Sequence, residues 1–395
     1  MPPAAATAAP GLAAGALMCV VGARPNFMKA APLLAALRRP PAVAFPTVLV
    51  HTGQHHGADM QEAFFRQLGL PRPDLDLEVG SAPAAVQTAE IMRRFDAVLE
   101  QAPPAAVLVV GDVTSTLACS LAAAKRGVPV VHVEAGLRSG DRAMPEEINR
   151  IVTDQLASLH LTTERGARDN LVREGIDPAG IRFVGNLMVD SLRAHAAEAV
   201  PVAATLERYA PGAGEGVAAG ELALVTMHRP SNVDDPAVLE GLVAALEAVS
   251  ERLPVVFPVH PRTRAALDRL RWPRGRARPL LTLPPVGYLE MLGLLRGARV
   301  VLTDSGGMQE ETTAEGIPCL TLRANTERPV TLEQGTNRLV GSDPERILAA
   351  VDDILTNGGR AGRIPELWDG HAADRIREVL SQWTPLCTTR TATRA

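Results

Sequence analysis

Short apolar runs alternate with longer amphipathic segments along almost the whole chain. The apolar runs predict buried strands at residues 17–21, 47–50, 107–110, 128–133 and 160–162, and again at 222–225, 254–257, 280–283, 300–302 and 319–322. The segments between them have helical periodicity, as at 27–37, 84–100 and 115–125. Strand–helix alternation of this kind predicts parallel sheets with right-handed crossover connections.

The alternation is interrupted at residues 195–220, where Ala, Gly and Pro replace the periodic pattern. A chain of 395 residues is long enough for two domains of ordinary size. We therefore predict an α/β protein with two doubly wound, Rossmann-like domains, residues 16–195 and 196–371. Residues 1–15 are expected to be a disordered extension, and residues 372–395 to form a C-terminal helix and tail.

Polar residues follow almost every predicted strand. In the first half they lie at 22–26, 51–55, 111–112 and 134–138, and in the second half at 227–229, 260–262, 304–307 and 323–328. Loops at the carboxyl ends of parallel strands gather at one edge of a sheet, where ligands bind. We expect the two edges to face a common cleft between the domains.

Two of these loops combine glycine with the start of a helix, residues 22–29 and 304–311. Backbone N–H groups and the helix dipole favour a phosphate at such a turn. Ser305 is expected to cap the second helix, Gly306 and Gly307 to let an anion approach, and Glu311 to accept hydrogen bonds from ribose hydroxyls. Neither loop has the spacing of a P-loop or a dinucleotide motif, so a plain strand–helix turn remains an alternative, more strongly for the first. Arg328 offers a planar fork suited to a diphosphate.

Acidic residues at apolar strand ends are the candidates for proton transfer. Asp112 and Glu134 follow consecutive strands, and Glu146 lies beyond a loop that returns to the same edge. Asp112 can alternatively cap the helix that follows it, and Glu147 is expected to form a salt bridge or a cap. His228 can be an acid, a phosphate ligand or a hydrogen-bonded core histidine.

Composition excludes several other classes of function. A formal charge of −4 and a pI near 6.2 argue against a nucleic-acid or anionic-membrane surface. No uncharged apolar stretch is long enough to span a bilayer, and no basic residue precedes Arg24 as a secretory signal requires. The four cysteines and the histidines lack metal-ligand spacing, so we expect reduced thiols in a cytoplasmic protein and no metal.

In their order along the chain, these motifs resemble those of the non-hydrolysing UDP-N-acetylglucosamine 2-epimerases. The resemblance covers about residues 17–383 and includes the segments 22–29, 52–55, 111–112, 133–141, 145–150, 184–186, 226–229, 258–260, 304–311 and 326–329. It implies a GT-B-like architecture, with the C-terminal helix crossing back onto the first domain. It also implies a homodimer, a UDP-sugar substrate and no cofactor.

The resemblance further implies roles for individual residues. Asp112, Glu134 and Glu146 correspond to catalytic acids, and Arg24, Lys29 and His228 to positions around the diphosphate and sugar. The UDP part corresponds to Ser305, Gly306, Gly307, Glu311 and Arg328, with Val286 and Met291 beside the uracil. Some bacterial relatives bind a second UDP-GlcNAc as an activator, at positions that correspond to Gln54, His55 and His260.

The expected reaction is reversible epimerisation at carbon 2 of UDP-GlcNAc, by elimination and re-addition of UDP through 2-acetamidoglucal. The alternatives are a hydrolysing epimerase that releases free ManNAc, a glycosyltransferase on the same fold, and a UDP-sugar sensor without catalysis. A modified sugar would use the same UDP-binding and acidic residues. The resemblance also implies that the product supplies a cell-surface polysaccharide.

Overall fold

The computed structural model describes residues 14–40, 45–53, 65–212, 217–272 and 280–385. The chain divides into two compact units, residues 1–191 with 366–395 and residues 192–365, and the division falls within helix α7 (Leu187–Ala194). Most of the extension expected at residues 1–15 lies outside the described residues. The two units are described separately.

The first unit contains a parallel sheet of seven strands among its described residues. Their order across the sheet is β3 (Leu75–Asp76), β2 (Thr47–His51), β1 (Leu17–Val21), β4 (Ala106–Val110), β5 (Val130–Val133), β6 (Leu159–Thr162) and β7 (Ile181–Phe183). The connection reverses direction between β1 and β4, which is the topological switch point of a doubly wound sheet. The turns after β1 and β4 therefore lie side by side, at the place where such sheets bind ligands.

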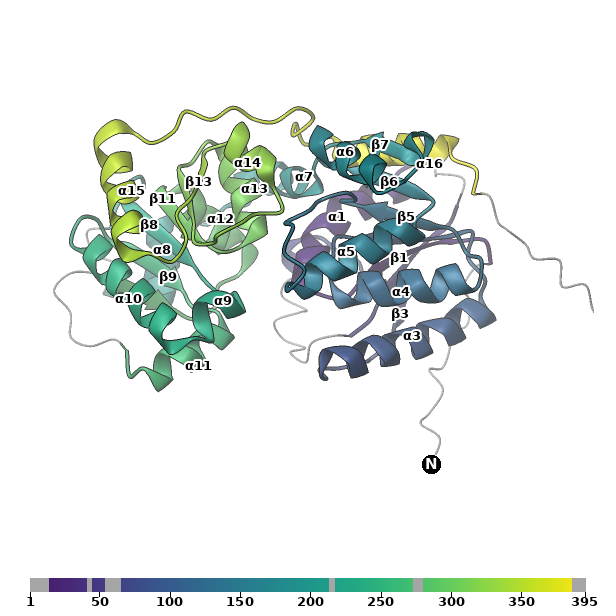
Figure 1. Ribbon diagram of the computed structural model, residues 1–395, viewed down its shortest axis with the longest axis horizontal. Helices are drawn as coiled ribbons and strands as arrows, with labels where there is room; N and C mark the ends of the chain where they lie inside the picture. The colour runs from purple at the N-terminus through teal and green to yellow at the C-terminus, as the bar shows by residue number, and fades with distance from the viewer. Residues whose placement is uncertain (1–13, 41–44, 54–64, 213–216, 273–279, 386–395) are drawn as a thin grey trace, which may run out of the picture. The chain divides into compact units, whose positions relative to one another are not determined.

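Helices of the first unit pack on its sheet in groups. Figure 1 shows α3 (Ala84–Gln101), α4 (Thr114–Lys125) and α5 (Pro145–Leu156) side by side. Ile91, Phe95 and Val98 of α3 share a buried cluster with alternate residues of β1 and β4, because successive strand residues point to opposite faces. α6 (Arg165–Arg173) packs against β6 and β7.

The C-terminal segment completes the first unit. α16 (Ala372–Gln382) packs against α1 (Arg24–Arg38). The carboxylate of Asp190 accepts hydrogen bonds from the amides of Ala372 and Ala373 at 3.2 and 2.8 Å, at the start of α16. Buried Trp368 donates its indole N–H to the carbonyl of Thr163 at 2.9 Å. These bonds join a segment from the end of the chain to the interior of the first unit.

The second unit repeats the doubly wound topology. Among its described residues a parallel sheet of six strands has the order β10 (Leu280–Leu283), β9 (Val255–Pro258), β8 (Leu222–Thr226), β11 (Ala298–Thr303), β12 (Cys319–Thr321) and β13 (Asn337–Leu339). Its switch point lies between β8 and β11. The loop after β8 and the start of the helix after β11 are therefore neighbours.

Two helical layers cover this sheet. α10 (Pro236–Ser250), α11 (Pro261–Arg269) and α15 (Pro344–Asn357) pack on one face in a cluster that includes Ala223 and Val225 of β8. α8 (Val202–Tyr209), α12 (Tyr288–Arg296) and Met308 of α13 (Gly306–Glu315) share a second cluster with Leu222 and Leu224. The short helices α9 (Pro230–Val233) and α14 (Pro329–Glu333) follow β8 and β12. Alternate residues of one buried strand thus serve both layers.

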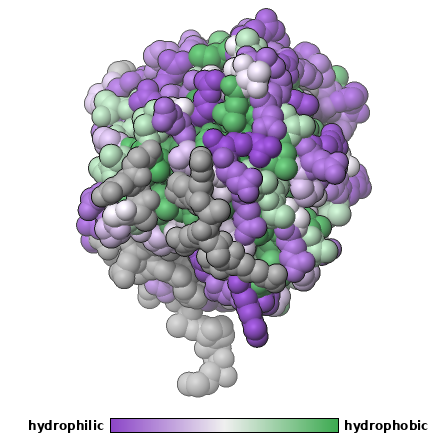
Figure 2. Space-filling model, turned by 90° about the vertical axis from the view of Figure 1, so that its left-hand side faces the viewer, coloured by the Kyte–Doolittle hydropathy of each residue, from purple (hydrophilic) through white to green (hydrophobic). Residues whose placement is uncertain are grey.

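The predicted fold class is confirmed, and each of the ten predicted strands overlaps an observed one. In the part of the chain that the structure describes, no helix is long and apolar enough to cross a membrane. On the face shown in Figure 2, hydrophilic residues are interspersed with small groups of apolar residues. This mixture is typical of a protein surface in contact with water.

Candidate functional site

The turn from β1 into α1 is held closed by one buried side chain. Asn26 accepts hydrogen bonds at Oδ1 from the amides of Gly22 and Ala23, at 3.1 and 3.2 Å, and donates through Nδ2 to the carbonyl of Val110 at 2.8 Å. It therefore joins the two strand ends of the switch point. The backbone of Arg24 begins α1 at this turn.

Lys29 and Glu134 form a buried ion pair at the same strand ends. The side chains of Lys29 and Glu134 are 8% and 4% exposed. Glu134 has φ 72°, in the left-handed region that residues other than glycine rarely adopt. Such strain is found at functional sites, where the surrounding structure imposes it. Gly111 lies next to this pair, because a Cβ there would be 3.6 Å from Nζ of Lys29 and 3.9 Å from Oε2 of Glu134.

Asp112 is held by two residues of α5. Arg150 donates to its carboxylate through Nε at 3.2 Å and also through Nη2, and Asn149 donates to its carbonyl at 2.8 Å. The side chain of Arg150 is 2% exposed and that of Asp112 is 24% exposed, so the carboxylate reaches solvent while its cation does not. The alternative in which Asp112 caps α4 is wrong, because Val113 occupies the N-cap position.

The two neighbouring glutamates at the start of α5 have different environments. Glu147 is buried and accepts hydrogen bonds from the amides of Ser139 and Gly140, both at 2.9 Å, from the Ser139 hydroxyl, and from Arg150. The expected salt bridge of Glu147 is therefore present, and its carboxylate fixes the preceding loop. Glu146 is only half-buried. Arg150 thus joins the loop held by Glu147 to Asp112.

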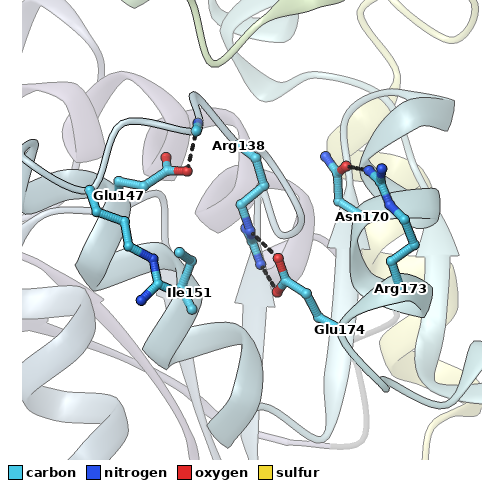
Figure 3. A pocket seen from close by; sticks show the side chains of 8 residues that line it. Arg138, Glu147, Ile151, Asn170, Arg173 and Glu174 are labelled. Atoms are coloured by element: carbon cyan, nitrogen blue, oxygen red, sulfur yellow. Dashed lines mark hydrogen bonds and ion pairs between the residues drawn. The ribbon is translucent and has the colours of Figure 1, made fainter.

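A shallow depression of about 280 Å³ lies beside this loop. Figure 3 shows Arg138 pointing toward Glu174, with which it forms a forked ion pair at 2.8 and 2.6 Å. Its other lining residues are Gly140, Arg142, Glu147, Ile151, Asn170 and Arg173. The depression does not contain Asp112, Glu134 or Glu146, so the predicted acids lie outside it.

In the second unit, Asp304 joins the loops on both sides of the switch point. Its fully buried carboxylate accepts hydrogen bonds from the amides of His228 and Arg229, at 3.0 and 2.9 Å, and from the side chain of Asn232 at 3.1 Å. Nδ1 of His228 lies 3.3 Å from Oδ1 of Asp304, and the imidazole is 39% exposed. His228 is therefore a partly exposed ring held at the switch point, not a core histidine.

The first turn of α13 is packed against Arg328. A Cβ on Gly306 would lie only 2.7 Å from Nη1 of Arg328, which explains the glycine at this position. Ser305 is the N-cap residue, as expected, but its side chain makes no capping hydrogen bond, so that part of the prediction is wrong. Its amide instead donates to the hydroxyl of Thr303 at 2.9 Å. Gly307 follows as the second residue of the helix.

Arg328 belongs to a buried cluster of arginines and glutamates. Its Nε lies 2.7 Å from Glu310 and its Nη1 lies 2.6 Å from Glu327. Glu327 also contacts Arg323 at 2.8 Å and Arg229 at 3.6 Å. Three guanidinium groups thus meet two carboxylates in this cluster, and the dipole of α13 favours an anion at the start of the helix.

The remaining residues predicted to bind UDP lie near the same helix. Glu311 is buried. The pKa of Tyr288 is raised by the burial of its own phenol and by the neighbouring carboxylate of Glu311. The phenol therefore keeps its proton beside Glu311. Val286 and Met291 pack in the apolar cluster that includes Met308 of α13. The structure thus places an apolar surface, a buried carboxylate and the glycine turn around one helix.

The predicted activator positions are only partly described. Gln54 and His55 lie outside the described residues. His260 is exposed and caps α11 by accepting a hydrogen bond from the amide of Arg262 at 3.2 Å. Its ring centroid lies 5.4 Å from that of His228, so the two imidazoles are neighbours.

Sequence reasoning did not assign a site role to several residues that hold the predicted ones in place. These are Asn26, His132, Arg150, Asp154, Tyr288, Asp304, Glu310, Arg323 and Glu327. Their partners are distant in the sequence, and the signal that could have found some of them is a charged residue inside an otherwise apolar run, as with His132. Among the described residues, no group of three or more His, Cys, Asp or Glu side chains could hold a metal ion. Cys19, Cys119 and Cys319 are buried free thiols.

Comparison with known proteins gives one consistent result. The model of a family described as UDP-N-acetylglucosamine 2-epimerase matches residues 36–381. The chain is 37% identical to the UDP-N-acetylglucosamine 2-epimerase of Methanocaldococcus jannaschii, covering 92% of this chain and 98% of that protein. It is 39% identical to the UDP-2,3-diacetamido-2,3-dideoxy-D-glucuronate 2-epimerase of Pseudomonas aeruginosa, with 93% and 99% covered. The crystal structure of M. jannaschii UDP-GlcNAc 2-epimerase in complex with UDP-GlcNAc and UDP is similar, with a TM-score of 0.82 and 36% identity over 92% of this chain and 99% of that one.

Proposed function

This protein belongs to the UDP-N-acetylglucosamine 2-epimerase family, and from that premise we propose that it interconverts UDP-GlcNAc and UDP-ManNAc without releasing free sugar. The observation that best supports this chemistry is the pair of acids at neighbouring strand ends, Asp112 after β4 and Glu134 after β5. Each carboxylate is paired with a buried cation, Arg150 or Lys29. Two acids fixed at one edge suit a reaction that moves a proton on both faces of a carbon.

In the proposed reaction, a carboxylate removes the proton from carbon 2 while the bond between carbon 1 and the diphosphate oxygen breaks. The C–H electrons form the double bond of 2-acetamidoglucal, and UDP leaves with the electrons of the broken bond. UDP then adds back to carbon 1, and carbon 2 receives a proton on its other face. Asp112, Glu134 and Glu146 are the proposed proton-handling groups. The balance closes with no oxidant, reductant or metal.

The departing diphosphate needs positive charge and hydrogen-bond donors. For this role we propose Arg24, Lys29 and His228, together with Ser305, Gly306, Gly307 and Arg328. The support is the cluster of three arginines beside the start of α13, the dipole of that helix, and the partly exposed His228. We propose Glu311 for the ribose, Val286 and Met291 for the uracil, and Gln54, His55 and His260 for a second, activating UDP-sugar.

The test is proton NMR of the purified protein with UDP-GlcNAc in deuterium oxide, without added NAD or metal. UDP-ManNAc carrying deuterium at carbon 2 is the expected product. Free ManNAc with UDP would instead identify a hydrolysing epimerase. An unchanged spectrum from a protein that binds UDP would contradict the assignment of UDP-GlcNAc as substrate.

A second candidate is the same reaction on a modified sugar. It is favoured by the 39% identity to the P. aeruginosa epimerase, which is as high as the identity to the M. jannaschii protein. The same NMR experiment with UDP-2,3-diacetamido-2,3-dideoxy-D-glucuronate decides between them, because the true substrate has the higher kcat/KM. We further propose a cytoplasmic homodimer, which cell fractionation and light scattering would check.

A further inference from the structure

His132 lies on β5, two residues before Glu134, and its side chain is fully buried. Both ring nitrogens have a polar partner. Nδ1 lies 2.6 Å from Oδ1 of Asp154, and Nε2 lies 2.9 Å from the carbonyl oxygen of Gly111. A carbonyl oxygen can only accept a hydrogen bond, so Nε2 must carry a proton.

Asp154 is held in place by further donors. Its Oδ2 accepts a hydrogen bond from the amide of Gly136 at 3.1 Å and lies 2.7 Å from Nη2 of Arg138. Burial alone would raise the pKa of Asp154, but its contacts with His132 and Arg138 together lower it. The Asp154 carboxylate therefore anchors the ring of His132 at Nδ1, while Nε2 donates to Gly111.

Two further contacts hold this group. Arg138 also pairs with the exposed Glu174 (Figure 3 shows the Arg138–Glu174 pair). Nε2 of His160 lies 2.7 Å from the backbone carbonyl oxygen of Asp154. The position of Asp154, and with it that of the His132 ring, is thus fixed from several sides.

The Gly111 carbonyl belongs to the peptide that carries Asp112. Gly111 has φ 67° and its amide donates to the carbonyl of Val133 at 3.0 Å, so the imidazole bond and this bond together hold both backbone polar groups of Gly111 to β5. We propose that His132 is a positioning residue: held at Nδ1 by Asp154, it fixes the Gly111–Asp112 peptide through Nε2 and thereby aims the Asp112 carboxylate. The claim that His132 affects catalysis rests on the proposed function, whereas the claim that it fixes the Gly111–Asp112 peptide rests on the geometry alone.

A matched pair of variants separates the two hydrogen bonds. The side-chain amide of His132→Gln reaches about as far as Nε2 and retains the bond to Gly111, whereas that of His132→Asn reaches only as far as Nδ1 and retains the bond to Asp154. For the epimerase reaction we expect kcat of His132→Asn to fall about 100-fold with KM nearly unchanged, since a misplacement near 1 Å costs roughly that much. For His132→Gln we expect kcat to fall less than 10-fold, because this variant retains the hydrogen bond that positions the Gly111 carbonyl. Val131→Ala, a core truncation on the same strand, controls for lost stability and should retain the wild-type kcat.

Two NMR readouts on the same samples need no turnover. In 15N-histidine-labelled protein, we expect Nε2 of His132 to carry a proton, because its partner is a carbonyl oxygen. The backbone amide signals of Gly111 and Asp112 should move more in His132→Asn than in His132→Gln. Equal kcat values in the two variants, unmoved amide signals in both, or an unprotonated Nε2 would each overturn the inference. If the wild type fails to turn over UDP-GlcNAc, the proposed function fails, while the NMR readouts still decide the position of the peptide.

Discussion

Replacing Gly306 by alanine tests the packing at the start of α13. The new Cβ would lie 2.7 Å from Nη1 and 3.0 Å from Cζ of Arg328, and 2.8 Å from Oε1 of Glu327. All three distances are shorter than the contacts that real Cβ atoms make. The guanidinium must therefore move, although its ion pairs with Glu310 and Glu327 at 2.7 and 2.6 Å hold it in place.

The cost follows from this conflict. Inserting one methyl group into a close-packed site destabilises a protein by about 1–3 kcal/mol. A displaced Arg328 would also be lost from the proposed UDP site. We expect the Kd for UDP to rise about 10- to 100-fold, which corresponds to roughly 1.4–2.8 kcal/mol of binding free energy.

Isothermal titration with UDP measures the Kd, and thermal unfolding measures the stability. Gly241→Ala in α10 is the control, because its Cβ would meet only Cγ of Pro344, at the start of α15, at an ordinary contact distance of 3.6 Å. That variant should be about 0.5–1 kcal/mol more stable and bind UDP normally. A Gly306→Ala protein with the wild-type Kd and Tm would refute the packing argument. Lower stability with an unchanged Kd would support the packing argument but would show that Arg328 does not bind UDP.

Three further predictions concern the first unit. Lys29→Met leaves the buried carboxylate of Glu134 without its cation, so we expect a loss of about 3 kcal/mol in the free energy of urea unfolding. The control, Lys125→Met at an exposed position, should change that free energy by less than about 0.5 kcal/mol. Equal effects of the two substitutions would contradict the stabilising role of the Lys29–Glu134 ion pair. Asp112→Asn should abolish deuterium incorporation at carbon 2 while leaving UDP affinity, measured by titration, unchanged; continued exchange would remove Asp112 from the reaction. Because the pKa of Asp154 is lowered in the folded state, its ionisation stabilises the protein above pH 3.8 and ceases to do so as the pH falls through the lower folded pKa. The difference in unfolding free energy between wild type and Asp154→Asn should therefore be constant from about pH 7 to 5 and shrink below that, and a difference that grows on acidification would contradict the assignment.

The sheets were predictable because their central strands are buried on both faces and read as continuous apolar runs. β1 and β10 begin and end where the apolar pattern does. The strands β3, β7 and β13 were not predicted, because they lie at sheet edges and are only two or three residues long. So short a segment has no measurable periodicity, and its pairing is decided by the neighbouring strand.

The candidate site was predictable to the level of loops, since strand order alone brings the ends of β1 and β4 together. The partners of the predicted residues were not predictable. Arg150 contacts Asp112 across 38 residues of sequence, and Asp304 binds the amide of His228 across 76. Whether the hydroxyl of Ser305 caps its helix likewise depends on the side-chain orientation, which only three-dimensional structure reveals.

The position of α16 in the first unit has a consequence for biosynthesis. The strands of that unit's sheet are translated before the 192–365 segment, but the helix that packs on α1 is translated only after it. At typical elongation rates of about 5–20 residues per second, those roughly 170 residues take on the order of 10–35 s. During that interval all strands of the first sheet are present, while α16 has not yet been made. The nascent chain thus exposes the surface of α1 that α16 covers until α16 emerges, which is the period in which chaperones would bind it.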